Sequence, residues 1–210
     1  VLFRPQADYN VVYTNTGLGF TPAWTTTEQD TSTAVAWADF DGDGRLDFAV
    51  ANTNGQPNRL YHNLGGGSFA RIENPPQLAD SQALAWADVD GDHDLDLAVG
   101  NDGANHLYCN DGAGTLALCW TSPESENTRA LAWADADRDG NLDLAVGNGS
   151  GEPLRLYTFT SPRSGGTVGG SGGIAGGSVW TSTETDDTHA LAWADADGDG
   201  QLELAVGNTG

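Results

Sequence analysis

The sequence has no lysine and no methionine. Its eight arginines stand against 30 acidic residues, which gives a net charge of −22. Such an acidic surface repels phosphate groups, so we expect neither nucleic acid nor anionic lipid as a partner. Apolar runs near the roughly 18 residues of a membrane-spanning helix are also missing, so we expect no membrane insertion. Since the chain starts at Val1 without a signal sequence, we expect a processed product or a fragment.

Cysteine is scarce, with Cys109 and Cys119 as its two examples. They flank NDGAG (110–114), a segment typical of a hairpin turn. The two thiols could therefore face each other on adjacent strands and form a disulfide, or both could stay reduced. A disulfide fits an oxidising environment, so we expect a protein that is extracellular, either secreted or at the cell surface.

What the sequence does contain is an internal repeat. Four similar segments open on a tryptophan, and the first of them reads WADFDGDGRLDFAVAN. The intervals between these tryptophans are 49, 47 and 60 residues, and the longest holds a glycine-rich insertion at 163–178. Removing about 13 residues there restores a constant period. The four tryptophans are Trp37, Trp86, Trp133 and Trp193.

Strand-like segments recur between these tryptophans. NVVYTN (10–15), NRLYHN (58–63), NHLYCN (105–110) and LRLYTF (154–159) alternate apolar and polar residues. With about four short strands per repeat and no helical period, we predict an all-β fold in a single domain, 1–210. The expected form is a β-propeller of about four four-stranded blades, in which the N-terminal strand completes the last blade. The alternative is an open arc, cut from a larger ring or completed by a neighbouring molecule.

Each repeat also carries an acidic loop, with carboxylates at loop positions 1, 3, 5 and 9 and a backbone carbonyl at position 7. Such an oxygen cage suits Ca²⁺, and the clustered negative charges repel one another without a cation. An EF-hand is excluded, because it needs glutamate at position 12 and every copy has valine there. We therefore predict about four structural Ca²⁺ ions.

The predicted ligands follow this spacing in all four loops. The position-7 residues Arg45, Asp94, Asn141 and Gln201 would bind through their carbonyls. The carboxylates are Asp39, Asp41, Asp43 and Asp47 in loop 1 (39–47), Asp88, Asp90, Asp92 and Asp96 in loop 2 (88–96), Asp135, Asp137, Asp139 and Asp143 in loop 3 (135–143), and Asp195, Asp197, Asp199 and Glu203 in loop 4 (195–203).

Two loops depart from the common pattern. His93 replaces the glycine at position 6 of loop 2, so that turn must tolerate a side chain. Glu203 replaces aspartate at position 9 of loop 4, and its longer arm is expected to shift or weaken that site. The alternative for all four loops is a set of solvated acidic turns without metal.

These loops, together with LYHNLGGGSF (60–69), resemble FG-GAP/VCBS repeats. Such repeats form the blades of integrin-α-type propellers and of many secreted microbial proteins, some fungal lectins among them. The resemblance covers almost the whole chain and implies that the loop carboxylates bind structural calcium. The family usually builds rings of seven blades, and four repeats depart from that number.

The sequence gives no pattern of catalysis. The histidines His62, His93, His106 and His189 share no motif, and no serine lies in a nucleophile elbow. We therefore expect a non-catalytic structural, adhesion or assembly module whose partners are other proteins or copies of itself. The alternatives are a lectin-like propeller that binds glycans, and a propeller fragment of a larger secreted enzyme or surface protein.

Two features bear on these alternatives. The tryptophans that open the repeats could pack between blades or present flat apolar surfaces to sugar rings. The segment Asn148-Gly149-Ser150 is an N-glycosylation sequon, which predicts a glycan on Asn148.

Overall fold

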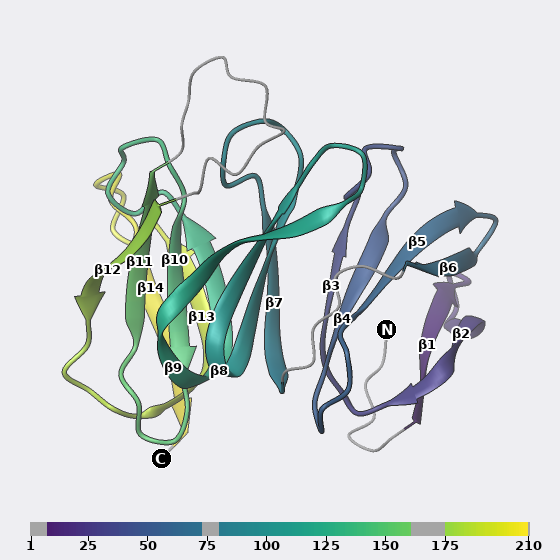
Figure 1. The fold of residues 1–210 in the computed structure, drawn as a ribbon, viewed down its shortest axis with the longest axis horizontal. Coiled ribbons are helices and arrows are strands. Elements are labelled where there is room, and N and C mark those ends of the chain that lie inside the picture. The colour runs from purple at the N-terminus through teal and green to yellow at the C-terminus, as the bar shows by residue number, and fades with distance from the viewer. Residues whose placement is uncertain (1–7, 73–79, 161–174, 210) are drawn as a thin grey trace.

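The computed structural model describes residues 8–72, 80–160 and 175–209. These residues form fourteen β-strands, and every pair with a described register is antiparallel (Figure 1). The prediction of an all-β chain is confirmed. Across the described ranges there is no helix that could cross a membrane. The predicted glycine-rich insertion, 163–178, falls mostly outside these ranges, and its last residues belong to a strand.

The first complete sheet corresponds to one repeat and has the strand order β3-β4-β5-β6. All six residues of β4 are buried, because a neighbouring strand lies on each side and packed side chains cover each face. This explains why the sequence of β4, DFAVAN, is nearly continuous in apolar and small residues. The strands are β3 (Ser32–Ala38), β4 (Asp47–Asn52), β5 (Arg59–Gly65) and β6 (Ser68–Ile72).

The second sheet has six strands in the order β12-β11-β10-β9-β8-β7 and contains two repeats. Two of its strands, β8 and β9, are long, and each supplies two of the strand segments that a repeat needs. The strands are β7 (Ser81–Ala87), β8 (Asp96–Asn110), β9 (Leu116–Ala134), β10 (Asp143–Asn148), β11 (Arg155–Thr160) and β12 (Ala175–Thr181).

Strand β8 turns back on itself. An extended strand of this length would separate its two ends by about 45 Å. Instead, the backbone N–H of Asn110 at one end donates to Asp96 Oδ1 at the other end, at 2.9 Å. Strand β9 crosses between repeats, because 116–127 pairs with β8 and 128–134 pairs with β10. Repeats 2 and 3 therefore each have four strand segments, like repeat 1 (β3–β6).

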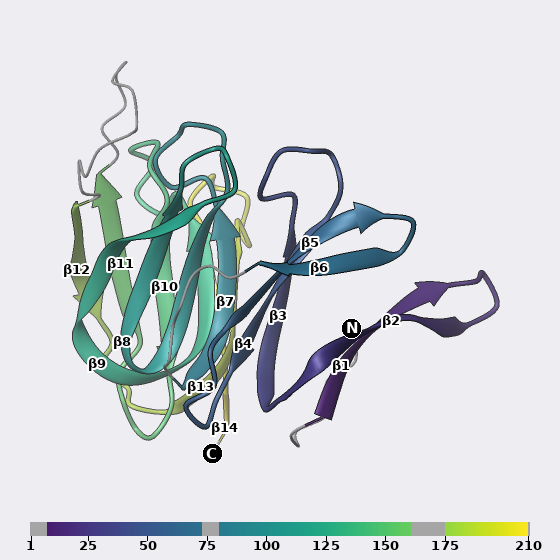
Figure 2. The same cartoon turned by 45° about the vertical axis from the view of Figure 1, so that its right-hand side comes forward.

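Two-stranded sheets lie at the ends of the described chain. They are β1 (Asp8–Asn15) with β2 (Phe20–Asp30), and β13 (Asp187–Ala194) with β14 (Glu203–Thr209), which form repeat 4. In Figures 1 and 2 the purple β1–β2 pair lies at one end of the row of sheets, away from the yellow β14. The prediction that the N-terminal strand completes the last repeat is wrong in this structure: in the described ranges β1 pairs only with β2, and β14 only with β13.

The first strands of the repeats lie next to one another in the order β3, β7, β9 and β13. Tryptophan side chains connect them, because the indole N–H of one repeat donates to a backbone carbonyl of the repeat before it. We call this set the tryptophan ladder. Its three hydrogen bonds run from Trp86 to Ala36 at 3.3 Å, from Trp133 to Ala85 at 3.4 Å and from Trp193 to Ala132 at 3.3 Å.

The ladder favours one of the two roles expected for these tryptophans. Trp86, Trp133 and Trp193 each connect a repeat to the repeat before it, as packing between repeats requires. Trp37 belongs to the first repeat, and in the described residues only the β1–β2 pair precedes it. Its side chain is 39% exposed. It packs against Phe48 and Phe69 of its own repeat.

Candidate metal centre

The four acidic loops connect the first and second strands of the four repeats, and all four fold alike. In each, the backbone N–H at position 6 donates to the carboxylate at position 1, which closes the turn. The donor–acceptor pairs are Gly44 and Asp39 at 2.8 Å, His93 and Asp88 at 3.1 Å, Gly140 and Asp135 at 3.0 Å, and Gly200 and Asp195 at 3.0 Å.

The next carboxylates are held in the same way. The N–H at position 5 donates to the carboxylate at position 3, and the N–H at position 7 donates to the carboxylate at position 5. In loop 2, for example, Asp92 N donates to Asp90 Oδ1 at 3.2 Å and Asp94 N donates to Asp92 Oδ1 at 3.0 Å. These bonds fix one oxygen of each aspartate and direct the side chains toward the inside of the turn.

This turn needs a left-handed backbone at position 6. The φ angles there are +84° at Gly44, +86° at Gly140 and +82° at Gly200. His93 adopts φ +80° at the same position, so loop 2 has the same turn as the other loops although it lacks the glycine. A side chain in this conformation costs roughly 1 to 2 kcal/mol relative to the usual helical region.

Position 9 begins the second strand and differs among the repeats. Asp47, Asp96 and Asp143 are at most 1% exposed, whereas Glu203 is exposed. Asp96 accepts the backbone N–H of Val89 at 2.9 Å through one oxygen and that of Asn110 through the other. The position-9 carboxylate thus joins its own loop to the third strand segment of the repeat.

Each loop brings at least three carboxylates together, with one oxygen of each within 4.8 Å of the others. Three predicted ligands lie outside these groups, namely Asp92 and Asp139 at position 5 of loops 2 and 3 and Glu203 at position 9 of loop 4, and Asp47 joins Asp41 in a separate group. The carbonyl ligands expected at Arg45, Asp94, Asn141 and Gln201 stay predictions. The groups are Asp39, Asp41 and Asp43; Asp88, Asp90 and Asp96; Asp135, Asp137 and Asp143; and Asp195, Asp197 and Asp199.

Buried oxygens without a donor test whether these residues fit a cation. Among the described residues, Asp39 Oδ1, Asp47 Oδ2 and Asp135 Oδ1 are buried and accept no hydrogen bond. A buried carboxylate oxygen left without a partner is strongly unfavourable. A hard divalent cation, bound by several carboxylates, supplies the missing partner. The residues of these loops therefore fit Ca²⁺.

Electrostatics lead to the same conclusion. Burial raises the pKa of Asp96 to about 7, and the neighbouring charges of Asp90 and Asp92 add to the effect. Burial also raises the pKa of Asp90, to about 6, and the pKa values of Asp47 and Asp143 move in the same direction. A bound cation reverses this effect, because it stabilises the ionised carboxylates.

One residue of the site was not found from the sequence. His62, on β5, places Nδ1 at 2.8 Å from Asp41 Oδ2 and 3.4 Å from Asp47 Oδ1. It forms a further close group with these two aspartates. Cys109 and Thr158 occupy the same place in repeats 2 and 3, so no repeated signal marks this histidine. Knowledge of how β5 pairs with β4 would have placed His62 beside loop 1.

Cys109 and Cys119 are joined by a disulfide, with their Cα atoms 5.7 Å apart. It links the third and fourth strand segments of repeat 2. Because this pair lies beside a hydrophobic cluster, the bond fixes the position of the hairpin against the core.

The predicted glycan on Asn148 is wrong for the folded chain. The side chain is fully buried, and its Nδ2 donates to Glu126 and to the carbonyl of Pro153, each at 2.8 Å. Its Oδ1 accepts from Thr128. The sequon coincides with a structural asparagine at the end of the second strand, where Asn52 and Asn101 occupy the same place.

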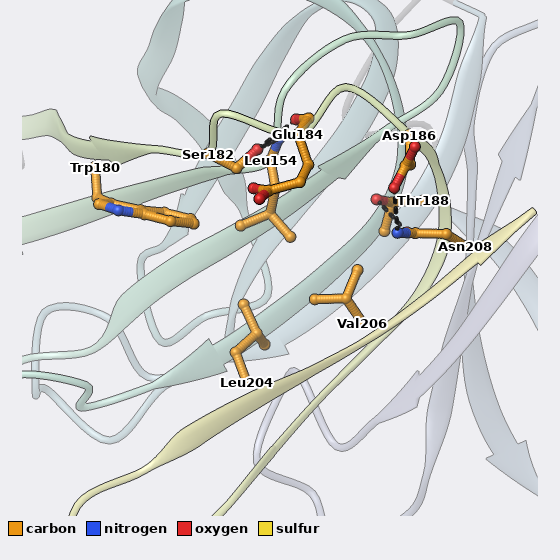
Figure 3. A pocket seen from close by; sticks show the side chains of 9 residues that line it. All are labelled: Leu154, Trp180, Ser182, Glu184, Asp186, Thr188, Leu204, Val206 and Asn208. Atoms are coloured by element: carbon orange, nitrogen blue, oxygen red, sulfur yellow. Dashed lines mark hydrogen bonds between the residues drawn. The ribbon is translucent and has the colours of Figure 1, made fainter.

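A second concave site lies on repeat 4 (Figure 3). Apolar side chains of β14 form its floor, and Trp180, which is 51% exposed, lies at one side. Asn208 lies at its edge and accepts a hydrogen bond from Thr188 at 2.9 Å. The site is lined by Leu154, Trp180, Ser182, Glu184, Asp186, Thr188, Leu204, Val206 and Asn208.

Comparison with known structures supports the fold. The crystal structure of the V. cholerae biofilm matrix protein Bap1 is 20% identical, with a TM-score of 0.53, over 86% of this chain. The matched region is 29% of that chain, so the present chain spans less than a third of its length. Among curated proteins, none matches.

A family model described as an FG-GAP-like repeat matches residues 1–50, 39–99 and 88–146. The matches are successive, and their shared segments contain loops 1 and 2. They cover more than half of the chain and agree with the strand order and the loops described above. The chain therefore belongs to the FG-GAP-like repeat family.

Proposed function

We propose that the chain is a non-catalytic, calcium-stabilised β-propeller module that serves adhesion or assembly outside the cell. The observation that carries this proposal is the set of buried carboxylate oxygens without donors in loops 1 and 3, whose turn geometry loops 2 and 4 share. Four acidic loops of one geometry, at the same place in four repeats, are expected of a structural ion, not of a single reaction centre.

Calcium would be held by the carboxylates at positions 1, 3, 5 and 9 and by the carbonyl at position 7. The ion would neutralise the clustered carboxylates and bind their oxygens. The chain itself provides the mechanical connection: Asn63 N donates to Asp47 at 2.6 Å, and Asn110 N donates to Asp96. An ion that fixes Asp47 and Asp96 would therefore also fix the third strands of repeats 1 and 2.

The propeller form is supported by the arrangement of the sheets. The first strands of successive repeats are neighbours, the later strands follow outward, and each sheet packs on the next. Under this proposal the described sheets are successive blades of an open arc.

An extracellular location is supported by the disulfide, by the strong negative charge and by the biofilm matrix protein found among similar structures. A non-catalytic role is supported by the use made of the acidic side chains. The loop carboxylates accept backbone N–H groups and converge on cation sites, so they are better suited to metal binding than to proton transfer.

Removal of calcium tests the proposal. In about 5 mM Ca²⁺ the protein should melt about 10 °C or more above its melting temperature in EDTA, because the ions bind the folded state only. Added Ca²⁺ should restore the higher value, and Mg²⁺ should restore less of it, since Mg²⁺ keeps its waters. Equal melting temperatures with and without EDTA, in a sample that contains no metal, would overturn the proposal.

A further inference from the structure

The second strand of repeat 4 is exposed where the corresponding strands are buried. Val50, Val99 and Val146 are at most 1% exposed, whereas Val206, at the same position of its repeat, is 42% exposed. In Figure 3 Val206 and Leu204 rise from β14 into the concave site, beside Trp180. A strand with the sequence of a core strand thus presents its apolar face and one edge to solvent.

Repeat 1 shows what covers this place. Its third strand pairs with β4 so that Tyr61 lies opposite Phe48. The Tyr61 ring packs edge-on against Trp24 at 5.3 Å, and its hydroxyl donates to Glu28 at 3.2 Å. Tryptophan and glutamate thus form a socket for the tyrosine of the third strand.

Repeat 3 repeats this arrangement. Tyr157 lies opposite Leu144, packs against Trp120 at 5.2 Å and donates to Glu124 at 2.7 Å. In both repeats the glutamate follows the tryptophan by four residues. The concave site of repeat 4 has the same pair at the same spacing.

That pair is Trp180 and Glu184, and Asn208 adds a third element of recognition. At the place of Asn208 in repeats 1 and 2, the backbone N–H donates to the side-chain oxygen of the asparagine that begins the third strand. The distances are 3.0 Å from Asn52 to Asn58 and 2.9 Å from Asn101 to Asn105. The concave site therefore has the groups that recognise a strand of the form Asn-x-apolar-Tyr.

Strand β1 has this form, with Asn10, Val12 and Tyr13. Its asparagine is placed as in the third strands: Asn10 N donates to Thr26 at 2.9 Å, and Asn10 Nδ2 donates to Ser32 at 2.9 Å. Asn105 N donates likewise to Ser122, and Asn58 Nδ2 to Ser81. The β1–β2 pair thus has the conformation of the outer half of a repeat.

We propose that β1 of a second copy of this chain pairs antiparallel with β14 and fills the concave site, so that copies join head to tail. The register of repeats 1 and 3 predicts Tyr13 opposite Leu204 and Val11 opposite Val206. Tyr13 then packs against Trp180 and donates to Glu184. Asn10 accepts the backbone N–H of Asn208.

The tryptophan ladder continues through this junction. The next strand of the incoming copy, β3, carries Trp37, which is 39% exposed and is the most exposed of the four tryptophans that open the repeats. In the joined copies its indole N–H donates to the carbonyl of Ala192, which occupies the place of Ala36, Ala85 and Ala132 in the other repeats. The contact is heterologous, so repetition builds a filament unless the rotation closes a ring.

One interaction of the internal junctions is missing at this one. Arg59 pairs with Asp30, and Arg155 pairs with Glu126. Asp186 occupies the place of these acids in repeat 4, but β1 has Val11 where the arginine would be. The substitution Val11→Arg should therefore strengthen the association.

The proposal rests on the calcium-stabilised module described above, and the experiment separates the two. Mass is measured by light scattering on the full chain in Ca²⁺, as a function of concentration. We expect multiples of 21.9 kDa that grow with concentration. Val206→Asp and Tyr13→Ala should each weaken association at least about tenfold, and Val11→Arg should strengthen it about threefold to tenfold. Leu118→Ser, at an exposed leucine of repeat 2 away from the junction, is the matched control and should change nothing.

The gain from Val11→Arg guards against unfolding as the cause, since a misfolded variant would not associate more tightly, and Asp186→Ala should cancel it. A monomer at all concentrations that still melts higher in Ca²⁺ would overturn the head-to-tail junction and leave the calcium module intact. Association unaffected by both Val206→Asp and Tyr13→Ala would also overturn it. A monomer whose Trp180 fluorescence responds to saccharides would identify the concave site as a glycan site instead.

Discussion

Loops 2 and 4 share the spacing of their acidic residues and the hydrogen bonds that close the turn, but their surroundings differ. Asp96 at position 9 of loop 2 is 1% exposed, with both oxygens bonded to backbone N–H groups. Glu203 at position 9 of loop 4 is exposed and accepts one such bond, from Ala196 at 2.7 Å. The loop sequence thus determines the turn, whereas the neighbouring third strand determines how far the metal site is buried.

Amide substitution at position 9 should give the largest contrast. Asp96→Asn should lower the free energy of unfolding in Ca²⁺ by about 2 to 4 kcal/mol, because it removes a ligand charge and turns an NH₂ group toward a buried N–H. Glu203→Gln should cost less than about 1 kcal/mol, since this side chain is exposed and water can replace the lost carboxylate interactions. Urea unfolding in saturating Ca²⁺ measures both. Equal losses would show that burial by the third strand does not distinguish the loops.

A smaller contrast is expected from pH in the absence of calcium. The pKa of Asp96 is raised by burial to about 7, so the folded state retains a proton that the unfolded state releases above about pH 4. Stability in EDTA should therefore fall as pH rises from about 4 to 7. The pKa of Asp199 in loop 4 is lowered by hydrogen bonds from Gln201, so this carboxylate gives no such loss.

The measurement is the melting temperature across this pH range, in EDTA and in Ca²⁺. Asp96→Asn should flatten the profile in EDTA, and Ca²⁺ should flatten it for the unaltered chain. A melting temperature in EDTA that rises from pH 5 to pH 7 would contradict the assignment of a buried, proton-retaining Asp96.

The smallest contrast compares loops 1 and 2 at position 6. Gly44 and His93 have φ angles of +84° and +80°, and only glycine adopts these without strain. His93→Gly should stabilise the protein by about 0.5 to 1 kcal/mol, and Gly44→His should destabilise it by a similar or larger amount. Calorimetry on the two variants in Ca²⁺ checks the signs. Destabilisation by His93→Gly would mean that the imidazole makes a contact worth more than the strain.

The repeat made much of the fold and of the site predictable. Strand alternation and the regular interval between tryptophans indicated an all-β chain of similar units, and the acidic spacing located four loops whose carboxylates converge. Both signals are local in sequence. Where the same local signal recurs four times, its geometry recurs as well, even at His93, which lacks the expected glycine.

What could not be predicted depends on contacts between distant segments. His62 reaches loop 1 from another strand and has no counterpart in the other copies. The sequon at Asn148 indicated a surface, but Thr128, Glu126 and Pro153 surround that side chain. The prediction that the N-terminal strand completes the last repeat rested on the likeness of its sequence to the third strands of the other repeats. That likeness does not say whether the strand comes from the same chain or from a second copy of it.

The tryptophan ladder has a mechanical consequence. Each of its bonds joins a repeat to the one before it, so a stretched chain would lose its repeats one after another rather than all together. Each event would release roughly 160 Å of extended backbone for a repeat of about 47 residues. In repeat 2 the bond between Cys109 and Cys119, 10 residues apart, would shorten that release by about 30 Å. The force trace of this chain would thus carry one shorter step, which disappears on reduction.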